Sequence, residues 1–255
     1  MRGAEEPERG SIIFTQGSNY GSFLEALATM DYAVFDFDGT LYPGLFIFDL
    51  TRKVFLEHNG ESAYRDKLEK LKNIATIYKG VDFKSAYTGY VSLLKNEDRG
   101  EFISMSRKLI SNSYKSAGAV IRELKEKYGI RAYLISLTAD FVAEIAQEHL
   151  GLAKAFSVGY LSESAGSGER FSGKTDMPIE DPQQMKERML SRLVEQRHAE
   201  GKFACFFDST DDLPIAKKAS LRVGINPKPG LSGYKGFDII LSGDADPWAG
   251  FLRLL

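Results

Sequence analysis

Residues 32–41 read Tyr-Ala-Val-Phe-Asp-Phe-Asp-Gly-Thr-Leu, and this stretch is the clearest signal of the fold class. Its first four residues are an apolar run of the kind that forms a strand buried on both faces of a parallel sheet. Asp36 and Asp38 come directly after the run, and Gly39 ends the extended pattern and begins a loop. Ligands of open α/β sheets bind beyond the carboxyl ends of the strands. The stretch therefore predicts a core strand with two carboxylates at the edge of the sheet where ligands bind.

Apolar runs alternate with helical patterns along most of the remaining chain. The further strands predicted from these runs are 132–135, 203–207, 222–225 and 236–241, and the predicted helices are 22–30, 117–128, 141–150, 182–195 and 213–219. Phe156–Tyr160 and Arg170–Phe171, on either side of the glycine- and serine-bearing stretch 164–168, predict a β-hairpin. Strands that alternate with helices predict an α/β fold, with a doubly wound parallel sheet as its core.

The segment between the first strand and the helix at 117–128 has a different pattern, because its apolar residues recur at three-to-four spacing. Four helices are predicted there: 48–56, 64–77, 83–94 and 102–110. We therefore expect a helical insert over residues 45–114, within a core formed by 19–44 and 115–255. Residues 1–18 are polar and contain glycine, so we expect them to form a loosely held N-terminal extension.

The composition excludes several classes of protein. Lys and Arg total 33 against 35 Asp and Glu, a balance that gives no electrostatic footprint for nucleic acid or an anionic membrane, so we expect neither as a partner. The single cysteine, Cys205, excludes an intramolecular disulfide and predicts a buried thiol. No apolar h-region begins the sequence and no run approaches about 18 apolar residues, so we expect a cytoplasmic protein. The three histidines match no metal-ligand spacing, which disfavours a zinc site.

A second acidic cluster, Asp208-Ser-Thr-Asp-Asp212, follows the predicted strand 203–207 as Asp36 and Asp38 follow theirs. Taken by itself, this cluster fits a solvated loop and a helix N-cap equally well. Together the two clusters place up to five carboxylates at one edge of the sheet. Like charges about 4 Å apart repel by about 4 kcal/mol at an effective dielectric of about 20, so such a site requires a cation. Oxygen ligands without Cys or His favour Mg²⁺.

Two further polar side chains, Ser136 and Lys186, are candidates. Ser136 comes just after the predicted strand 132–135, where a helix-capping serine is the alternative interpretation. Lys186 lies near the start of its predicted helix, 22 residues before Asp208, and most helix lysines are simply solvated. Neither residue indicates a function by itself.

Taken in order, these residues resemble the four motifs of the haloacid dehalogenase (HAD) superfamily, over residues 31–241. The motifs are Asp36-x-Asp38-Gly-Thr, Ser136, Lys186 and Asp208-Ser-x-x-Asp212. The segments most similar to the phosphoserine-phosphatase-like branch are Val91-Ser-Leu-Leu94, Gly118-x-x-x-Arg122-Glu-Leu124 and the Ser172-Gly-Lys174 hairpin. The resemblance implies a Rossmann-like HAD core with an inserted α-helical C1 cap and a β-hairpin flap.

The same resemblance implies catalytic roles. Asp36 would attack phosphorus to form an aspartyl-phosphate, and Asp38 would protonate the leaving alcohol and later deprotonate water. Ser136 would hold a phosphoryl oxygen, and Lys186 would neutralise charge beside the nucleophile. The substrate-binding residues implied are Gly39, Thr40 and Ser136. Two alternatives stay open, because Thr138 could replace Ser136 and Lys174 could replace Lys186; we favour Ser136 because it directly ends the predicted strand, and Lys186 for its distance from Asp208.

The resemblance also implies a Mg²⁺ site. An oxygen of Asp36, the backbone carbonyl of Asp38 and Asp208 would bind the ion, and Asp212 would support its coordination shell. The function expected is a Mg²⁺-dependent phosphatase of a small phosphorylated metabolite. Asp38 disfavours a dehalogenase, which needs no leaving-group acid, and a P-type pump, which has Thr there. Phosphoryl transfer to another alcohol and a catalytically silent, phospho-ligand-binding protein are the alternatives.

Three positions depart from the family pattern. Phe207 stands where the family usually has Gly before the metal aspartate, which motivates the silent alternative. Leu45 and Tyr90 stand where phosphoserine phosphatases usually place a glutamate and an arginine, so phosphoserine is not the expected substrate. The tyrosines of the insert are spaced as in a helix core, and we assign them no role.

Overall fold

A computed structural model of the chain describes residues 11–15, 19–58, 62–79, 82–166, 168–196 and 198–255. The strands are β1 (Ser11–Phe14), β2 (Tyr32–Phe35), β3 (Arg131–Ala139), β4 (Lys154–Val158), β5 (Tyr160–Ala165), β6 (Gly168–Thr175), β7 (Phe203–Phe207), β8 (Leu221–Ile225) and β9 (Ile239–Ser242). The α-helices are α1 (Tyr20–Leu27), α2 (Phe46–Glu57), α3 (Ser62–Lys79), α4 (Phe83–Leu93), α5 (Arg99–Leu109), α6 (Lys115–Tyr128), α7 (Asp140–Leu150), α8 (Pro182–Glu195), α9 (Leu213–Ala216) and α10 (Trp248–Leu254).

The predicted α/β core is confirmed. Within the described residues, seven strands form one sheet in the order β1-β9-β8-β7-β2-β3-β4, and every pairing in it except that of β1 is parallel. In the register of the central strands, Phe35 of β2 lies opposite Phe206 of β7 and Leu134 of β3. The carboxyl ends of β2, β7 and β3 therefore meet at one edge of the sheet, as parallel pairing requires.

Aromatic packing holds the centre of this sheet in place. The rings of Phe35 and Phe206 stack with centroids 4.4 Å apart, and Trp248 of α10 packs over both. Cys205 of β7 is buried and has no disulfide, as predicted. The strands that carry the two acidic clusters are thus fixed to each other below the loops that follow them.

The N-terminal edge of the sheet corrects one prediction. Residues 11–14 are not part of a loose extension, because they form β1 and pair antiparallel with β9. Ile12 and Phe14 pack against the core while Ile13 is exposed, the alternation of a half-buried strand. The strand covers the edge of β9, which would otherwise present unpaired backbone groups. Residues 1–10 and 16–18 lie outside the described residues.

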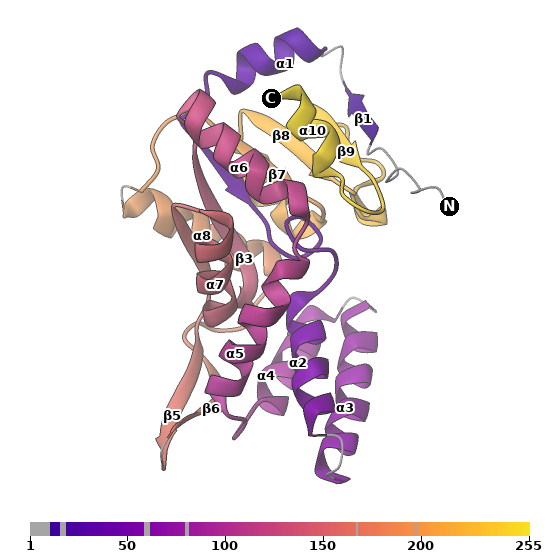
Figure 1. The fold of residues 1–255 in the computed structure, drawn as a ribbon, viewed down its shortest axis with the longest axis vertical. Helices are drawn as coiled ribbons and strands as arrows, with labels where there is room; N and C mark the ends of the chain where they lie inside the picture. The colour runs from indigo at the N-terminus through magenta and orange to yellow at the C-terminus, as the bar shows by residue number, and fades with distance from the viewer. Residues whose placement is uncertain (1–10, 16–18, 59–61, 80–81, 167, 197) are drawn as a thin grey trace, which may run out of the picture.

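The helical insert follows β2 and precedes α6. Its helices α2, α3, α4 and α5 pack together, and they lie at the lower end of the molecule in Figure 1, away from β8 and β9. The four helices predicted for this segment are present, with bounds that shift by a few residues. Among the described residues, no helix combines the length and the apolar character that a membrane crossing requires.

The predicted hairpin is present but begins later than expected. Phe156 belongs to β4, where it lies opposite Ile135 in the main sheet, and the hairpin is formed by β5 and β6. Gly159 separates the two strands and donates its backbone N–H to Asp176 Oδ1 at 2.8 Å. The apolar run Phe156–Tyr160 is therefore divided at Gly159: Phe156 belongs to the main sheet and Tyr160 to the hairpin.

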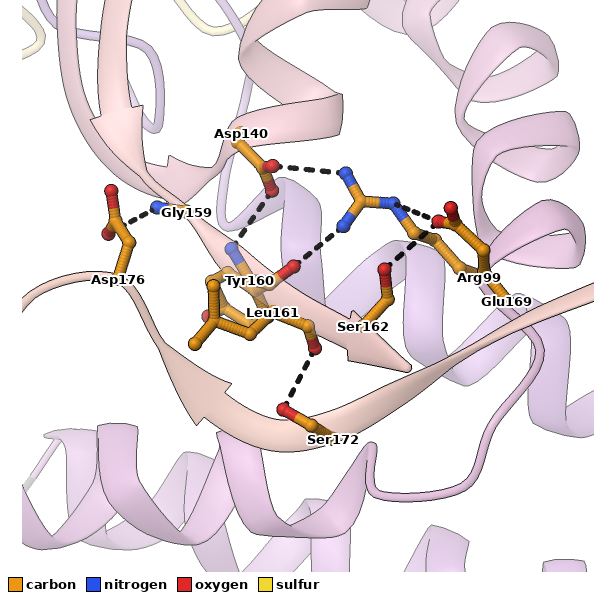
Figure 2. Close-up of polar contacts among 9 residues, drawn as sticks. All are labelled: Arg99, Asp140, Gly159, Tyr160, Leu161, Ser162, Glu169, Ser172 and Asp176. Carbon is orange, nitrogen blue, oxygen red and sulfur yellow. Dashed lines mark hydrogen bonds and ion pairs between the residues drawn. The ribbon is translucent and has the colours of Figure 1, made fainter. Parts of the chain in front are cut away.

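Arg99, the first residue of α5, joins the insert, the hairpin and the core (Figure 2). Its guanidinium donates to the carbonyl of Tyr160 at 2.6 Å and to Asp140 Oδ2 at 3.0 Å. The other carboxylate oxygen of Asp140, at the start of α7, accepts the backbone N–H of Tyr160 at 3.1 Å. The side of the insert formed by α5 is thereby fixed to the core through the hairpin.

Candidate active site

Three carboxylates and one lysine converge at the carboxyl edge of the sheet. Asp36 follows β2, Asp208 follows β7, and Asp212 ends the short 3₁₀ helix after Asp208. One oxygen from each of the three lies within 4.8 Å of the others, and all three residues are buried. Lys186 of α8 lies between two of them, with its Nζ 2.8 Å from Asp36 Oδ1 and 2.6 Å from Asp212 Oδ1. Four of the predicted site residues therefore form one cluster.

Gly39 allows the loops after β2 and β7 to approach each other. Its φ is +85°, and a Cβ at this position would lie 2.7 Å from Asp208 Cγ. Only glycine meets both conditions without strain. The next residue, Thr40, is fully buried, and its carbonyl accepts the indole N–H of Trp248 at 2.9 Å. Gly39 thus has a structural role, and the substrate contact expected of Gly39 and Thr40 stays a prediction.

Asp38 is not one of the three clustered carboxylates, although the charges of Asp36 and Asp208 act on it. Its Oδ1 accepts the backbone N–H of Phe46 at 2.6 Å, which ties the side chain to the first turn of α2. Burial raises the pKa of Asp38 to about 7, and the nearby charge of Asp36 adds to the shift. The carboxyl lines a small cavity of about 40 Å³ under the insert, together with Leu45 and Thr138.

The structure corrects one reason for preferring Ser136. Ser136 does not end its strand, because β3 continues to Ala139 with a register shift against β4 after Ile135. Ser136 is buried, and its Oγ accepts the backbone N–H of Thr138 at 3.3 Å. The hydroxyl of Thr138 is buried without a hydrogen-bond partner among the described residues and belongs to the wall of the cavity beside Asp38. Both hydroxyls therefore stand at this end of the sheet.

Lys186 and its alternative, Lys174, differ clearly in their surroundings. Lys174 is exposed on β6, whereas Lys186 is buried and makes the two carboxylate contacts given above. The role predicted for the lysine requires a positive charge beside the buried carboxylate of Asp36, and Lys186 provides that charge. The geometry therefore supports the preference for Lys186.

The sequence reasoning missed Lys228, which lies in the loop after β8. Its Nζ forms an ion pair with Asp208 Oδ2 at 2.8 Å, and its backbone N–H donates to the carbonyl of Asp208 at 2.7 Å. The available signal was its position, since Lys228 follows a core strand at the same edge of the sheet as the acidic loops. The loop has no cluster of acidic residues, so the acidic pattern does not single it out.

The donor set fits a hard divalent cation. Asp208 Oδ1 is buried and has no hydrogen-bond partner among the described residues, although Lys228 contacts the other oxygen of this carboxylate. Burial raises the pKa of Asp208 to about 6, against the opposing effect of Lys228. Asp36, Asp208 and Asp212 supply only oxygen ligands, which Mg²⁺ prefers. A magnesium ion would satisfy the unpartnered oxygen and reduce the cost of burying these charges.

A cleft of about 730 Å³ leads to this edge of the sheet. Ser209, Asp211 and Lys228 line it from the core, and Phe83 and Lys84 line it from the start of α4. The cleft therefore opens between the sheet edge and the insert, on the side where the acidic loops lie.

These features define a class of protein, namely an α/β protein with a mostly parallel sheet whose candidate site is built on the loops after the strands. Residues 33–217 match the family of haloacid dehalogenase-like hydrolases. The match covers more than half of the chain, so the chain belongs to the HAD-like hydrolase family. The resemblance predicted from the four motifs is confirmed, as is the assignment to the hydrolase class of enzymes.

Solved structures with the same fold include two of phosphoserine phosphatase. A substrate-bound phosphoserine phosphatase complex has 21% sequence identity and a TM-score of 0.62, and covers 85% of this chain and 94% of its own. A phospho-aspartyl intermediate analogue of phosphoserine phosphatase has 22% identity and a TM-score of 0.61, with 86% and 95% covered. A protein of unknown function from Bordetella pertussis Tohama I has 18% identity and a TM-score of 0.67, with 85% and 99% covered. The search of curated proteins gave no match.

Proposed function

We propose that this protein is a Mg²⁺-dependent phosphatase that hydrolyses a small phosphorylated metabolite through an aspartyl-phosphate on Asp36. The observation that carries the proposal is the buried cluster of Asp36, Asp208 and Asp212 around Lys186, at the edge of the sheet reached by the cleft. Such a cluster costs free energy unless cations neutralise its charges. The structural similarity to phosphoserine phosphatases supports the same chemistry.

The proposed reaction has two steps. In the first, an oxygen of Asp36 forms a bond to phosphorus, the phosphoester bond breaks, and the leaving oxygen takes a proton from Asp38. In the second, water attacks the phosphorus of the aspartyl-phosphate, Asp38 takes a proton from that water, and phosphate and Asp36 are released. Asp38 lies under the insert and lines the cavity, which suits a group that acts on the leaving oxygen.

The remaining polar residues would position the phosphoryl group. Lys186 holds Asp36 through its 2.8 Å contact and places a positive charge beside it, and a hydroxyl of Ser136 or Thr138 would donate to a phosphoryl oxygen. Asp36, Asp208, Asp212 and the carbonyl of Asp38 would hold Mg²⁺, which when bound supplies positive charge for the phosphoryl oxygens. We further propose that residues 45–114 act as a cap over a core of 19–44 and 115–255.

Phosphate release from p-nitrophenyl phosphate, with Mg²⁺ or with a chelator, tests the proposal. Asp36→Asn should abolish turnover while the far-ultraviolet circular dichroism stays unchanged, and Asp38→Asn should lower the rate by roughly 10²–10⁴-fold, as for a general acid–base residue. Asp244→Asn, in an exposed loop, is the matched control and should keep full activity. Full activity of Asp36→Asn would refute the mechanism. Phosphorylation of an added alcohol in place of phosphate release would indicate the transferase alternative.

A further inference from the structure

The cavity beside Asp38 has an apolar wall. Leu45 and Phe48 line it from the start of the insert, and Phe83, Tyr87 and Tyr90 line it from α4. Of the described residues that line it, Asp38 alone is ionisable at neutral pH. The position where phosphoserine phosphatases usually carry an arginine is thus occupied by the buried ring of Tyr90.

The hydroxyl groups of the two tyrosines are engaged with the protein. Tyr87 donates to the carbonyl of Leu137 at 2.7 Å. The Tyr90 hydroxyl lies 2.5 Å from Thr51 Oγ1 and 3.3 Å from the carbonyl of Ile47. These bonds fix both side chains, so a group in the cavity meets mainly hydrocarbon and ring surface. The buried and unpartnered hydroxyl of Thr138 is the neutral polar group on the wall.

The cavity volume limits the size of the group that it can hold. About 40 Å³ corresponds to roughly three heavy atoms, at about 10–15 Å³ for each water-sized position. Leu45 and Phe83 also line the large cleft, so a longer chain could continue into it.

We infer that the preferred substrate is a phosphate monoester whose alcohol is short, uncharged and apolar next to the ester oxygen. This inference rests on the proposed phosphatase function and names its substrate class. A carboxylate in the cavity would face Asp38 without a cation to pair with. An ammonium group would find Asp38 as its counter-charge, but Asp38 must carry the proton for the leaving oxygen. An apolar group needs no partner and gains from leaving water.

Three phosphate esters with the same number of heavy atoms in the alcohol test this inference directly. They are propyl phosphate, 2-hydroxyethyl phosphate and 2-aminoethyl phosphate, which differ in one terminal group. We expect kcat/KM to be highest for propyl phosphate, by about 10-fold over the hydroxyl ester and about 100-fold over the amino ester, because the cavity leaves polar groups unpaired. The polar esters have the better leaving groups, so intrinsic reactivity works against this order. Equal or better hydrolysis of either polar ester would overturn the inference.

A variant pair locates the effect in the cavity. Leu45→Ala should lower kcat/KM for propyl phosphate about 10-fold and change that for methyl phosphate less than about twofold. Leu56→Ala, on α2 with its side chain 43% exposed, should change neither. Equal loss for methyl and propyl phosphate in Leu45→Ala would mean that Leu45 supports the fold and not the choice of alcohol, and would count against the inference.

The outcomes separate this inference from the proposed function. Hydrolysis of polar esters in preference to propyl phosphate refutes the substrate class and leaves the phosphatase proposal in place. If none of the three esters is hydrolysed although p-nitrophenyl phosphate is, the inferred substrate class is refuted; if p-nitrophenyl phosphate is not hydrolysed with Mg²⁺ either, the phosphatase proposal is refuted. Calorimetric titration of the Asp36→Asn variant with the three esters tests the cavity without turnover. Tighter binding of propyl phosphate supports the apolar preference of the cavity, and equal binding of all three esters overturns the inference.

Discussion

Replacement of Lys186 by Met tests whether ionic contacts hold the carboxylate cluster together. Lys186 is 3% exposed and lies 2.8 Å from Asp36 and 2.6 Å from Asp212. At these distances and an effective dielectric of about 20, each contact is worth about 6 kcal/mol before desolvation is counted. Burial of the ammonium offsets much of this attraction, and removal of one partner from a buried pair typically costs about 3–5 kcal/mol. We expect that loss in the free energy of unfolding.

Urea denaturation, followed by the fluorescence of the single tryptophan, measures this change. Trp248 packs on Phe35 and Phe206, so its emission reports on the sheet beneath the site. The measurement is made with a chelator and repeated with Mg²⁺. Mg²⁺ should recover part of the loss, because it places positive charge among the same carboxylates and binds the folded state.

Lys218→Met is the matched control. The Nζ of Lys218 lies 2.7 Å from Glu187 Oε1, a distance similar to those at Lys186, but the side chain of Lys218 is 51% exposed. Exposed pairs contribute little to stability, so this variant should unfold like the wild type. A loss of less than about 1 kcal/mol in Lys186→Met, against the roughly 3–5 kcal/mol expected for a buried pair, would contradict the ionic role of Lys186. An equal loss in both variants would refute it as well.

Three further outcomes are expected. Gly39→Ala should destabilise the fold by about 1–2 kcal/mol, because residue 39 has a positive φ. The new Cβ would also displace Asp208, so calorimetry should show weaker Mg²⁺ binding, and an unchanged Mg²⁺ affinity would contradict this. Burial raises the pKa of Asp38 to about 7 and that of Asp208 to about 6, above the roughly 3.9 of an unfolded aspartate. The folded chain then binds more protons between about pH 4 and pH 7, so the urea midpoint of the metal-free protein should fall as pH rises through that window, and a rising midpoint would argue against the shifts. Arg99→Met removes the 2.6 Å hydrogen bond to the carbonyl of Tyr160, so amide hydrogen exchange at Tyr160 should become faster. Unchanged exchange would show that Asp140 holds the hairpin without Arg99.

The parts of the fold that were predictable are those with a local signal. The apolar runs before Asp36 and Asp208 become β2 and β7, because a strand buried on both faces has few polar residues. Gly129 ends α6 in the left-handed conformation, and Asp181 caps α8 ahead of Pro182. From the strand ends alone, Asp36, Asp208 and Asp212 could therefore be expected at one edge of the sheet, whereas Lys186 was expected there from the resemblance to the family motifs.

The parts that were not predictable depend on partners far along the chain. β1 has four residues and becomes a strand through pairing with β9, more than 200 positions later. Phe156 was assigned to the hairpin because nothing local shows that β4 joins the main sheet. Lys228 could not be singled out, because a lysine in a loop is ordinary until its contact with Asp208 is known. Each of these positions is decided by tertiary contacts.

Phe207 was the sequence feature that favoured a catalytically silent protein, and its surroundings weaken that interpretation. Its ring stacks on Phe237 with centroids 5.1 Å apart and meets Tyr234 at 6.2 Å, whereas the preceding residue, Phe206, stacks on Phe35 across the other face of the sheet. Asp208 lies just beyond the end of β7, and its carboxylate pairs with Lys228 at 2.8 Å. The large side chain is therefore accommodated in the core beneath the loop after β8, while Asp208, the proposed metal ligand, is retained. A substitution that leaves the buried, costly set of charges intact gives no physical reason for the site to be inactive.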